Sequence, residues 1–248
     1  SALQHGYGLF ETIRVAAGVP LLLELHLERL RDGLAALDLP PPPDADTVRR
    51  FAVSHAVPAG ADGALKLVAA DGRLMVWFGR PPRSMRNPAT LLVFDQWRRH
   101  AASPLSRHKP MSYLENMRLI QAARQAGADE AVVLNTSGRL CDGSRTTLYV
   151  VRHGEALTPR GADGALPGVI RRLLLEVGRA REAVLTPRDL AAADAVFLSN
   201  ALLGIVTVHR ILGVERRLPT HAAIRSARRT LAARWQDEID RHGRSASR

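Results

Sequence analysis

The sequence contains one cysteine and two lysines, and it has no long run of apolar residues. The single cysteine, Cys141, cannot form an internal disulfide or build a thiolate metal site alone, so we predict neither a disulfide nor a metal. No apolar run approaches the roughly 18 residues that cross a membrane, and no basic-then-apolar leader opens the chain. These absences favour a cytoplasmic protein with no membrane contact.

The basic residues are numerous but scattered. The formal net charge is +11, and all but two of the 35 basic residues are arginines. A large positive charge can indicate nucleic-acid binding, but such proteins gather their cations into a patch, and here they are spread over helices and loops. We therefore favour a protein with no nucleic-acid partner. The shortage of lysine leaves only Lys66 and Lys109 for chemistry that needs an amine.

The spacing of apolar residues predicts a first α/β lobe. Residues 9–15 alternate apolar and polar like a half-buried strand, and a hairpin is expected to return over 19–23. Leucines three and four apart between Leu27 and Leu37 predict an amphipathic helix that ends at the prolines 40–43. The remaining expected elements are a helix at 47–56, a hairpin at 65–69 and 74–78 around Asp71-Gly72, and a last strand at 91–94.

A second α/β lobe follows an irregular stretch. Its expected helices are 112–126, 168–180 and 221–240, and its expected strands are 131–134, 146–151, 195–198 and 205–208. Ser112 is the expected N-cap and Gly127 the C-cap of the first of these helices, and residues 241–248 are expected to fray. The sequence thus predicts a mixed α/β fold with a smaller N-terminal lobe (1–103), a linker (104–110) and a larger C-terminal lobe (111–248).

Lys109 lies in the predicted linker, beside His108 and Pro110. Pockets tend to form where domains meet, and burial near other cations favours the neutral amine that attacks a carbonyl group. Tyr113, four residues later, could place its phenol in the same pocket. Taken alone, this pattern also fits a solvated surface lysine.

Several motifs flank Lys109 in a fixed order. They are GLFETIRV (8–15), HLERL (26–30), KPMSYLEN (109–116), GADEAVVLN (127–135), DGS (142–144) leading to LYVV (148–151), LTP (157–159) and LPGVIR (166–171). In this order and spacing the set resembles the class IV aminotransferases, which include branched-chain aminotransferases, D-amino-acid aminotransferases and aminodeoxychorismate lyases. The resemblance covers about residues 6–208. It implies a two-lobed fold of type IV, pyridoxal phosphate (PLP) as cofactor, a small-molecule substrate and a homodimer.

The resemblance also assigns the cofactor-binding residues. Lys109 takes the position of the lysine that carries the cofactor as a Schiff base. Arg29 takes that of a phosphate-binding arginine, whose guanidinium fork suits phosphate oxygens. Gly168, Val169 and Ile170 take that of a loop whose backbone N–H groups hold the phosphate, and the start of a helix is a favourable place for an anion.

Asp142 is one of several departures from the family pattern. It stands where the family usually has the glutamate that keeps the pyridine nitrogen protonated, and it is one methylene shorter. Thr147 replaces a common asparagine, Ile170 a frequent threonine, and Tyr7 a common aspartate, and the chain starts later than the pattern does. These departures keep open a relative that retains the fold, binds the cofactor poorly and serves as a binding protein.

The segment 199–205 (SNALLGI) bears on the reaction. Branched-chain aminotransferases usually carry Gly-Thr-Ala where this chain has Asn200, Ala201 and Leu202, and the segment looks more like that of aminodeoxychorismate lyases. Asn200 and Ala201 are thus expected at the cofactor.

The lyase reading predicts conversion of 4-amino-4-deoxychorismate to 4-aminobenzoate and pyruvate. Lys109 would be the general base, and Thr12 or Tyr113 would assist the leaving group. The alternative is a class IV aminotransferase that acts on a branched-chain or other amino acid.

Overall fold

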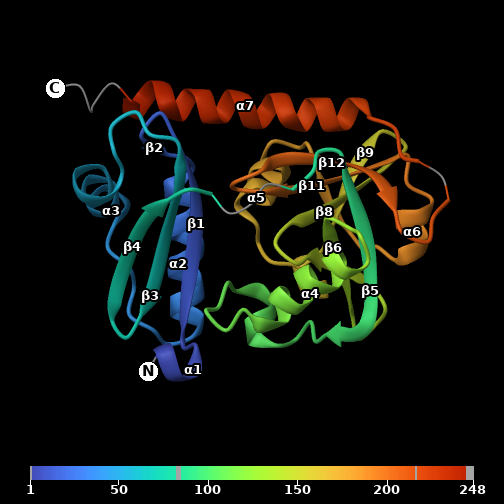
Figure 1. Cartoon of the computed structure of the whole chain (residues 1–248), viewed down its shortest axis with the longest axis horizontal. Helices are drawn as coiled ribbons and strands as arrows, with labels where there is room; N and C mark the ends of the chain where they lie inside the picture. Colours follow the sequence, from blue (N-terminus) through green and yellow to red (C-terminus); the bar gives the residue numbers. More distant parts are fainter. Residues whose placement is uncertain (1, 82–84, 216, 244–248) are drawn as a thin grey trace. The chain divides into compact units, whose positions relative to one another are not determined.

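The computed structural model describes residues 2–81, 85–215 and 217–243, and the chain forms two compact units (Figure 1). One unit contains residues 2–81, 108–112 and those from 232 onward; the other contains 85–107 and 113–231, within the described ranges. Each unit is built on its own sheet and combines strands with helices. The predicted mixed α/β fold is confirmed.

The first unit is built on a four-stranded antiparallel sheet with the order β2-β1-β3-β4. Its elements are α1 (Ala2–His5), β1 (Gly8–Ala16), β2 (Val19–Pro20), α2 (Leu23–Ala36), α3 (Ala45–Phe51) with a π-helical turn (Ala52–Ala56), β3 (Gly63–Ala70) and β4 (Arg73–Gly79). The alternation that predicted β1 is confirmed, because Leu9, Ile13 and Val15 are buried while Phe10 and Thr12 are half-buried on the other face.

Helix α2 covers the buried face of this sheet. Its leucines 23, 27, 30 and 34 are almost completely inaccessible and pack with Leu9 and Ile13 of β1. Burial of each such side chain contributes roughly 1.5–3 kcal/mol, so this stripe dominates the stability of the unit. The predicted second strand is shorter than expected, because Leu22 adopts a positive φ of 56° and turns the chain directly into α2.

The hairpin of β3 and β4 is confirmed together with its turn. Asp71 and Gly72 both have positive φ, 51° and 69°, as a two-residue turn of type I′ requires.

The segment that carries Lys109 pairs with the beginning of β1. The Phe10 N–H donates to the Lys109 carbonyl at 2.9 Å, the Met111 N–H donates to the Gly8 carbonyl at 2.9 Å, and Leu9 bridges Pro110 in antiparallel fashion. The backbone of Lys109 is therefore held in register with the GLFETIRV motif.

The second unit is built on a mixed eight-stranded sheet with the order β10-β9-β8-β11-β12-β5-β6-β7 (Figure 1). Its strands are β5 (Ala89–Arg99), β6 (Glu130–Asn135), β7 (Leu140–Gly143), β8 (Thr147–Arg152), β9 (Glu155–Pro159), β10 (Arg181–Ala183), β11 (Ala195–Asn200) and β12 (Gly204–Ile211). The assignment of 91–94 to the first lobe is wrong, because β5 pairs in parallel with β6 and β12. Strands β7, β9 and β10, of three to five residues, are too short for a clear periodic signal and were not predicted.

The helical elements of this unit are short, except for the last. They are 3-10 turns at Pro104–Arg107 and Gly161–Asp163, α4 (Leu114–Gln125), α5 (Val169–Glu176), α6 (Pro187–Ala191) and α7 (Ala222–His242), whose residues from Ala232 onward group with the first unit. No helix among the described residues is long and apolar enough to cross a membrane.

The predicted ends of two helices change. Helix α4 begins at Leu114 after Tyr113, without a side-chain cap, so Ser112 is not its N-cap. Gly127, with φ 74°, follows the last turn, as expected of a residue that ends a helix. Residues 241 and 242 belong to α7 rather than to a frayed tail, and residues 244–248 lie outside the described residues.

Gly8 is required by the close approach of the Lys109 segment. A Cβ at Gly8 would lie 2.6 Å from the Ala69 carbonyl oxygen and 2.9 Å from the Met111 sulfur. We expect Gly8→Ala to destabilise the protein by about 2 kcal/mol, because overpacking forces the backbone to move. Gly79→Ala is the control, since nothing lies within 4 Å of a Cβ there. Equal urea midpoints for the two variants would contradict this account.

Candidate functional site

Lys109, Phe10 and Lys66 lie together on one side of the first sheet. The Lys109 Nζ is 4.4 Å from the centroid of the Phe10 ring, and the Lys66 Nζ is 5.0 Å from the same centroid. Both positions suit a cation–π contact. Thr12 is half-buried on this face and is the pairing partner of Lys66. The structure thus places Lys109 and Thr12 on one side of β1, and it brings Lys66 closer than its position on an ordinary strand suggested.

Arg29 is held by a buried carboxylate on the opposite face of β1. Its Nε donates to Glu11 Oε1 at 2.8 Å and its Nη2 donates to Glu11 Oε2 at 2.6 Å, a two-pronged ion pair. His26, one turn earlier on α2, makes a 2.7 Å hydrogen bond to Glu11 Oε2 through Nδ1. Glu11 and His26 are each 1% exposed.

The charges around Glu11 decide its ionisation. Burial opposes the charged form, but the charges of Arg29 and His26 and their hydrogen bonds outweigh it and bring the pKa of Glu11 to about 2. Burial lowers the pKa of His26 by more than the attraction of Glu11 raises it. His26 is therefore neutral at pH 7 and donates its Nδ1 proton to Glu11. Its buried Nε2 has no hydrogen-bond partner within the described part of the chain.

Sequence analysis missed Glu11 and His26, although both stand in the quoted motifs. The available signal was the spacing of His26 and Arg29, which puts their side chains on one face of a helix. Two polar residues on the leucine-lined face of a helix need a buried partner, and an acidic residue in the strand beneath is the simplest one.

A second group of candidate residues surrounds segment 142–147, which links β7 to β8. Asp142 is 4% exposed, and among the described residues its oxygens accept hydrogen bonds only from the backbone N–H groups of Gly143 and Leu166, both at 3.2 Å. Burial raises the pKa of Asp142 to about 7, against the opposing charges of Arg99 and Arg171. The carboxylate is therefore poorly neutralised by its surroundings.

Segment 142–147 also contacts three other predicted residues. The Tyr113 hydroxyl donates to the Ser144 carbonyl at 3.0 Å, and the Asn200 amide donates to the Arg145 carbonyl at 3.2 Å. A Cβ at Gly168 would lie 2.7 Å from Thr147 Oγ1, so only glycine permits this approach. Asn200 Oδ1 accepts the N–H groups of Leu202 and Leu203 and so closes the turn that contains Ala201.

Glu130 anchors the segment from inside. It is 1% exposed and accepts hydrogen bonds from the Ser144 N–H at 3.0 Å, the Thr146 hydroxyl at 2.9 Å and the Ser144 hydroxyl. Burial raises the pKa of Glu130, and these donors only partly oppose that shift. Sequence analysis missed this residue; its signal was a lone acidic residue at the start of the apolar strand EAVVLN.

The start of α5 provides a place for an anion. Gly168 precedes the helix in an extended conformation, and the N–H groups of the first turn have no partner within the helix. Val169 and Ile170 are 4% and 2% exposed, so they can offer only backbone donors. The candidate residues thus comprise amines, a buried carboxylate, a fixed guanidinium and a helix N-terminus. In the first unit the amines suit an aldehyde and the guanidinium suits a phosphate. In the second unit the carboxylate suits a basic ring nitrogen and the helix N-terminus suits a phosphate.

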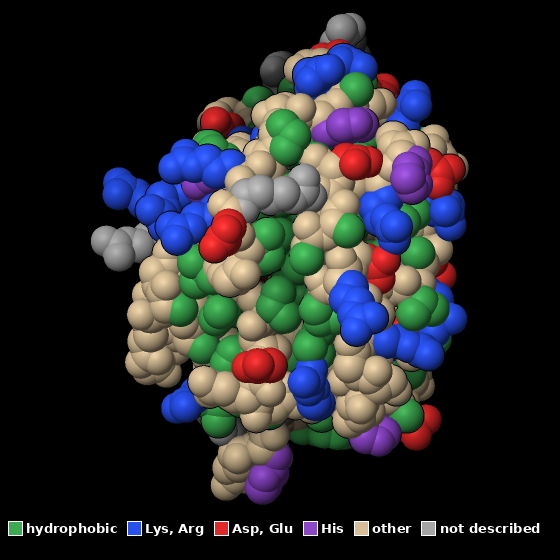
Figure 2. Space-filling model, turned by 90° about the vertical axis from the view of Figure 1, so that its right-hand side faces the viewer, with side chains coloured by type: hydrophobic (Ala, Val, Ile, Leu, Met, Phe, Trp, Pro, Cys, Tyr) green, Lys and Arg blue, Asp and Glu red, His purple; other side chains and the backbone are tan. Residues whose placement is uncertain are grey.

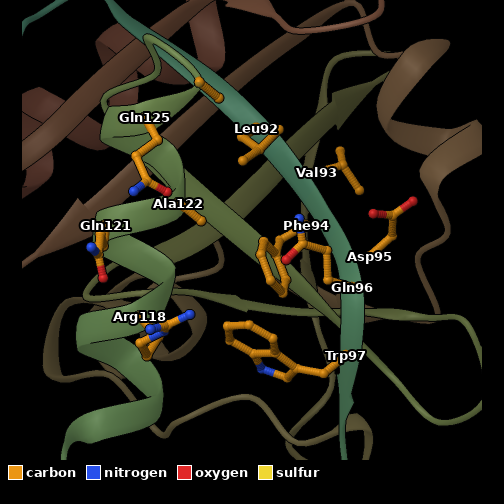
Figure 3. Close-up of a pocket in the computed structure, with 11 residues that line it drawn as sticks. Leu92, Val93, Phe94, Asp95, Gln96, Trp97, Arg118, Gln121, Ala122 and Gln125 are labelled. Carbon is orange, nitrogen blue, oxygen red and sulfur yellow. The ribbon is translucent and has the colours of Figure 1, made fainter.

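A pocket of the second unit lies away from these residues. It has a volume of about 280 Å³ between β5 and α4, and Figure 3 shows Phe94 and Trp97 on the side of β5 that faces Arg118 and Gln121. None of the candidate residues lines it.

The described residues contain no group of three or more His, Cys, Asp or Glu side chains that could hold a metal. On the face shown in Figure 2, Lys and Arg side chains lie in several separate places around hydrophobic ones.

Known proteins are similar to this chain over the part that contains the candidate residues. The amino-transferase class IV family model matches residues 8–211. A bifunctional aminodeoxychorismate lyase / D-amino acid transaminase of Mycobacterium tuberculosis is 30% identical, over 88% of this chain and 86% of its own length. A putative branched-chain-amino-acid aminotransferase of Methanocaldococcus jannaschii is 27% identical, over 85% and 81%. The crystal structure of a putative 4-amino-4-deoxychorismate lyase of Legionella pneumophila matches with a TM-score of 0.83 at 27% identity, over 94% of this chain and 93% of that one.

The buried Asp142 predicts an unusual dependence of stability on pH. In the cofactor-free protein the folded state keeps a proton on Asp142 up to about pH 7, whereas the unfolded state loses it near its ordinary pKa of 3.8. Stability therefore falls as the pH rises between these values. We expect Asp142→Asn to gain about 3 kcal/mol relative to the natural protein between pH 5 and pH 8, measured by urea unfolding. The exposed Asp95→Asn serves as control, and a parallel pH dependence of all three proteins would contradict the assignment.

Proposed function

The chain belongs to the class IV amino-transferases, a family of enzymes that use pyridoxal phosphate, and we propose that it is the lyase that converts 4-amino-4-deoxychorismate to 4-aminobenzoate and pyruvate. The observation that carries the choice of reaction is the turn after β11. Asn200 spans from this turn to the Arg145 carbonyl, where branched-chain aminotransferases usually have Gly-Thr-Ala. Two of the similar proteins above carry the lyase in their names.

The residues present fit PLP. The Asp142 carboxylate is buried and its hydrogen bonds come only from backbone N–H groups, so a protonated ring nitrogen would supply the missing cation. The raised pKa of Asp142 means that proton sharing with the ring costs little at neutral pH. Aspartate in place of the longer glutamate is compatible with this role if the ring approaches segment 142–147 closely.

Two groups are proposed to bind the phosphate. Arg29 offers a guanidinium that Glu11 holds in one orientation, which reduces the conformational entropy lost on binding. Residues 168–170 offer backbone N–H groups at the positive end of α5, and the interior position of Ile170 explains why a threonine hydroxyl is dispensable there.

The chemistry divides between the cofactor and the protein. PLP bound to the substrate nitrogen supplies an acceptor for the electrons released when the C4–H bond breaks. Lys109, once its amine is free, takes this proton as general base. The ether C–O bond then breaks with its electrons going to the oxygen, and the departing enolate needs a proton on its CH2 carbon to become pyruvate. Thr12 is the better donor, since it lies on the Lys109 side of β1, whereas the Tyr113 hydroxyl already donates to Ser144.

Transamination is the second candidate, because similar proteins are also named as D-amino acid and branched-chain aminotransferases. The same lysine and cofactor would serve it, and the reaction would differ in the substrate that is bound.

A homodimer, proposed from the family resemblance, is supported by exposed apolar side chains on the second unit, Leu105, Leu114 and Met117. A cytoplasmic location is supported only by the buried, unpaired Cys141.

The first test is release of pyruvate from 4-amino-4-deoxychorismate by the holoenzyme without any 2-oxo acid. We expect pyruvate and 4-aminobenzoate in equal amounts. Lys109→Ala should abolish turnover and the borohydride-trapped cofactor, whereas Lys66→Ala should retain the trapped cofactor at residue 109. Peptide mass mapping distinguishes the two lysines, which share one aromatic ring. Amino exchange without pyruvate would reject the lyase, and trapping at Lys66 would reject the assignment of Lys109.

The second test concerns the phosphate. If Glu11 orients Arg29 toward it, Glu11→Gln should weaken PLP binding about tenfold relative to pyridoxal, which lacks the phosphate. Arg29→Lys should act in the same direction. If Glu11 had a purely structural role, Glu11→Gln would weaken the binding of PLP and of pyridoxal equally. That result would reject the proposal that Glu11 and Arg29 together bind the phosphate.

A further inference from the structure

Arg145 occupies the middle of segment 142–147. The residue before it accepts the Tyr113 hydroxyl, its own carbonyl accepts the Asn200 amide, and Thr147, two residues later, lies against Gly168. Four residues assigned to the cofactor or to catalysis, Tyr113, Asp142, Gly168 and Asn200, are therefore in contact with, or part of, the segment that carries this arginine.

The Nε atom of Arg145 has no hydrogen-bond acceptor among the described residues. The side chain is half-buried, and its Nε is inaccessible to solvent. Arg99 and Arg171, whose charges act on Asp142, have acceptors for their Nη2 atoms: Arg99 donates to the Asn116 side chain, and Arg171 donates to the Pro159 carbonyl and to Glu182, although its Nε also lacks a partner among the described residues. An N–H group that is withdrawn from water without an acceptor is costly, so the Nε of Arg145 is suited to an acceptor from outside the chain.

Glu130 does not fill this role. Its charge attracts Arg145, but its oxygens are occupied by Ser144, Thr146 and the backbone of Ala131, all on the inner side of the segment. Glu130 thus fixes the backbone while the guanidinium stays available. The Arg145 guanidinium, a planar group of N–H donors, therefore lies in the same segment as residues assigned to the cofactor.

We propose that Arg145 binds a carboxylate of the substrate, so that the enzyme accepts amines that carry a carboxylate and discriminates against neutral ones. The inference rests on the proposed function for the identity of the site, and it adds the class of group that the substrate must present. A carboxylate matches the guanidinium fork with two parallel hydrogen bonds. The cofactor phosphate is the competing anion, and it is already assigned Arg29 and the start of α5.

The test compares a carboxylate with a neutral amide of the same shape. Binding of 4-aminobenzoate and 4-aminobenzamide to the holoenzyme is measured by calorimetry, which does not depend on turnover. We expect the natural protein to bind the carboxylate more tightly than the amide. Arg145→Gln should weaken the binding of 4-aminobenzoate by about tenfold or more and leave the binding of 4-aminobenzamide unchanged. Arg145→Lys should keep part of the preference. The exposed Arg124→Gln should behave like the natural protein.

Two further comparisons of an acid with its amide test the inference in case the protein is an aminotransferase. D-Alanine and L-leucine are compared with their amides by the spectral change of the bound cofactor, in the same four proteins. Loss of the carboxylate preference in Arg145→Gln with either pair supports the inference, even if pyruvate release fails and the lyase is rejected.

Three results would overturn the inference. The natural protein could show no preference for carboxylates in either pair. Arg145→Gln could keep the preference or weaken acid and amide equally, which would indicate a structural role beside Glu130. Arg145→Gln could also lose the preference for PLP over pyridoxal, which would assign the arginine to the cofactor phosphate.

Discussion

The removal of carboxylates from water is the constraint on which both candidate groups depend. Five acidic residues of the described part of the chain are almost completely buried, and three of them, Glu11, Glu130 and Asp142, lie among the candidate residues and are each stabilised differently. Glu11 is neutralised by Arg29 and hydrogen-bonded by His26, so it stays charged and holds a cation. Glu130 is surrounded by hydroxyl and N–H donors and holds a loop. Asp142 accepts two long backbone hydrogen bonds and keeps its affinity for a proton. This affinity suits a residue that interacts with a protonated base.

These three arrangements separate scaffolding from chemistry. Glu11 is compensated by charge and stays ionised, whereas burial raises the pKa of both Glu130 and Asp142. Glu130 has hydroxyl and N–H donors around it, and Asp142 has two long backbone hydrogen bonds. The same contrast exists among the arginines, since Arg29 and Arg99 have acceptors in the protein and Arg145 Nε has none among the described residues. Arg49 Nη1, Trp97 Nε1 and Arg171 Nε also lack a partner among the described residues, so a buried nitrogen without an acceptor points to function here only together with its place beside the candidate residues.

Much of the fold followed from the sequence because its signals are local. The alternation of β1, the leucine stripe of α2 and the Asp71-Gly72 turn each specify an element through a handful of neighbours. The assignment of β5 failed because pairing between distant strands is not encoded in either strand alone. The motifs located Lys109, Arg29 and Asp142, but Glu11, Glu130 and Arg145 acquire their meaning from partners elsewhere in the chain and were not identified. The comparisons establish the family and leave the individual roles as proposals.

The first unit is formed by three separate stretches of the chain, so it cannot complete its folding early in synthesis. Its chain comes from three places, and the last of them, beyond residue 232, supplies the Glu238 carboxylate that accepts the Leu22 N–H at 3.0 Å and the Trp235 ring beneath Arg14. A ribosome must therefore have synthesised the chain beyond residue 238 before the sheet beside Lys109 acquires these contacts. Until then the leucine face of α2 depends on local packing alone, and the nascent chain is at its most vulnerable to aggregation and proteolysis.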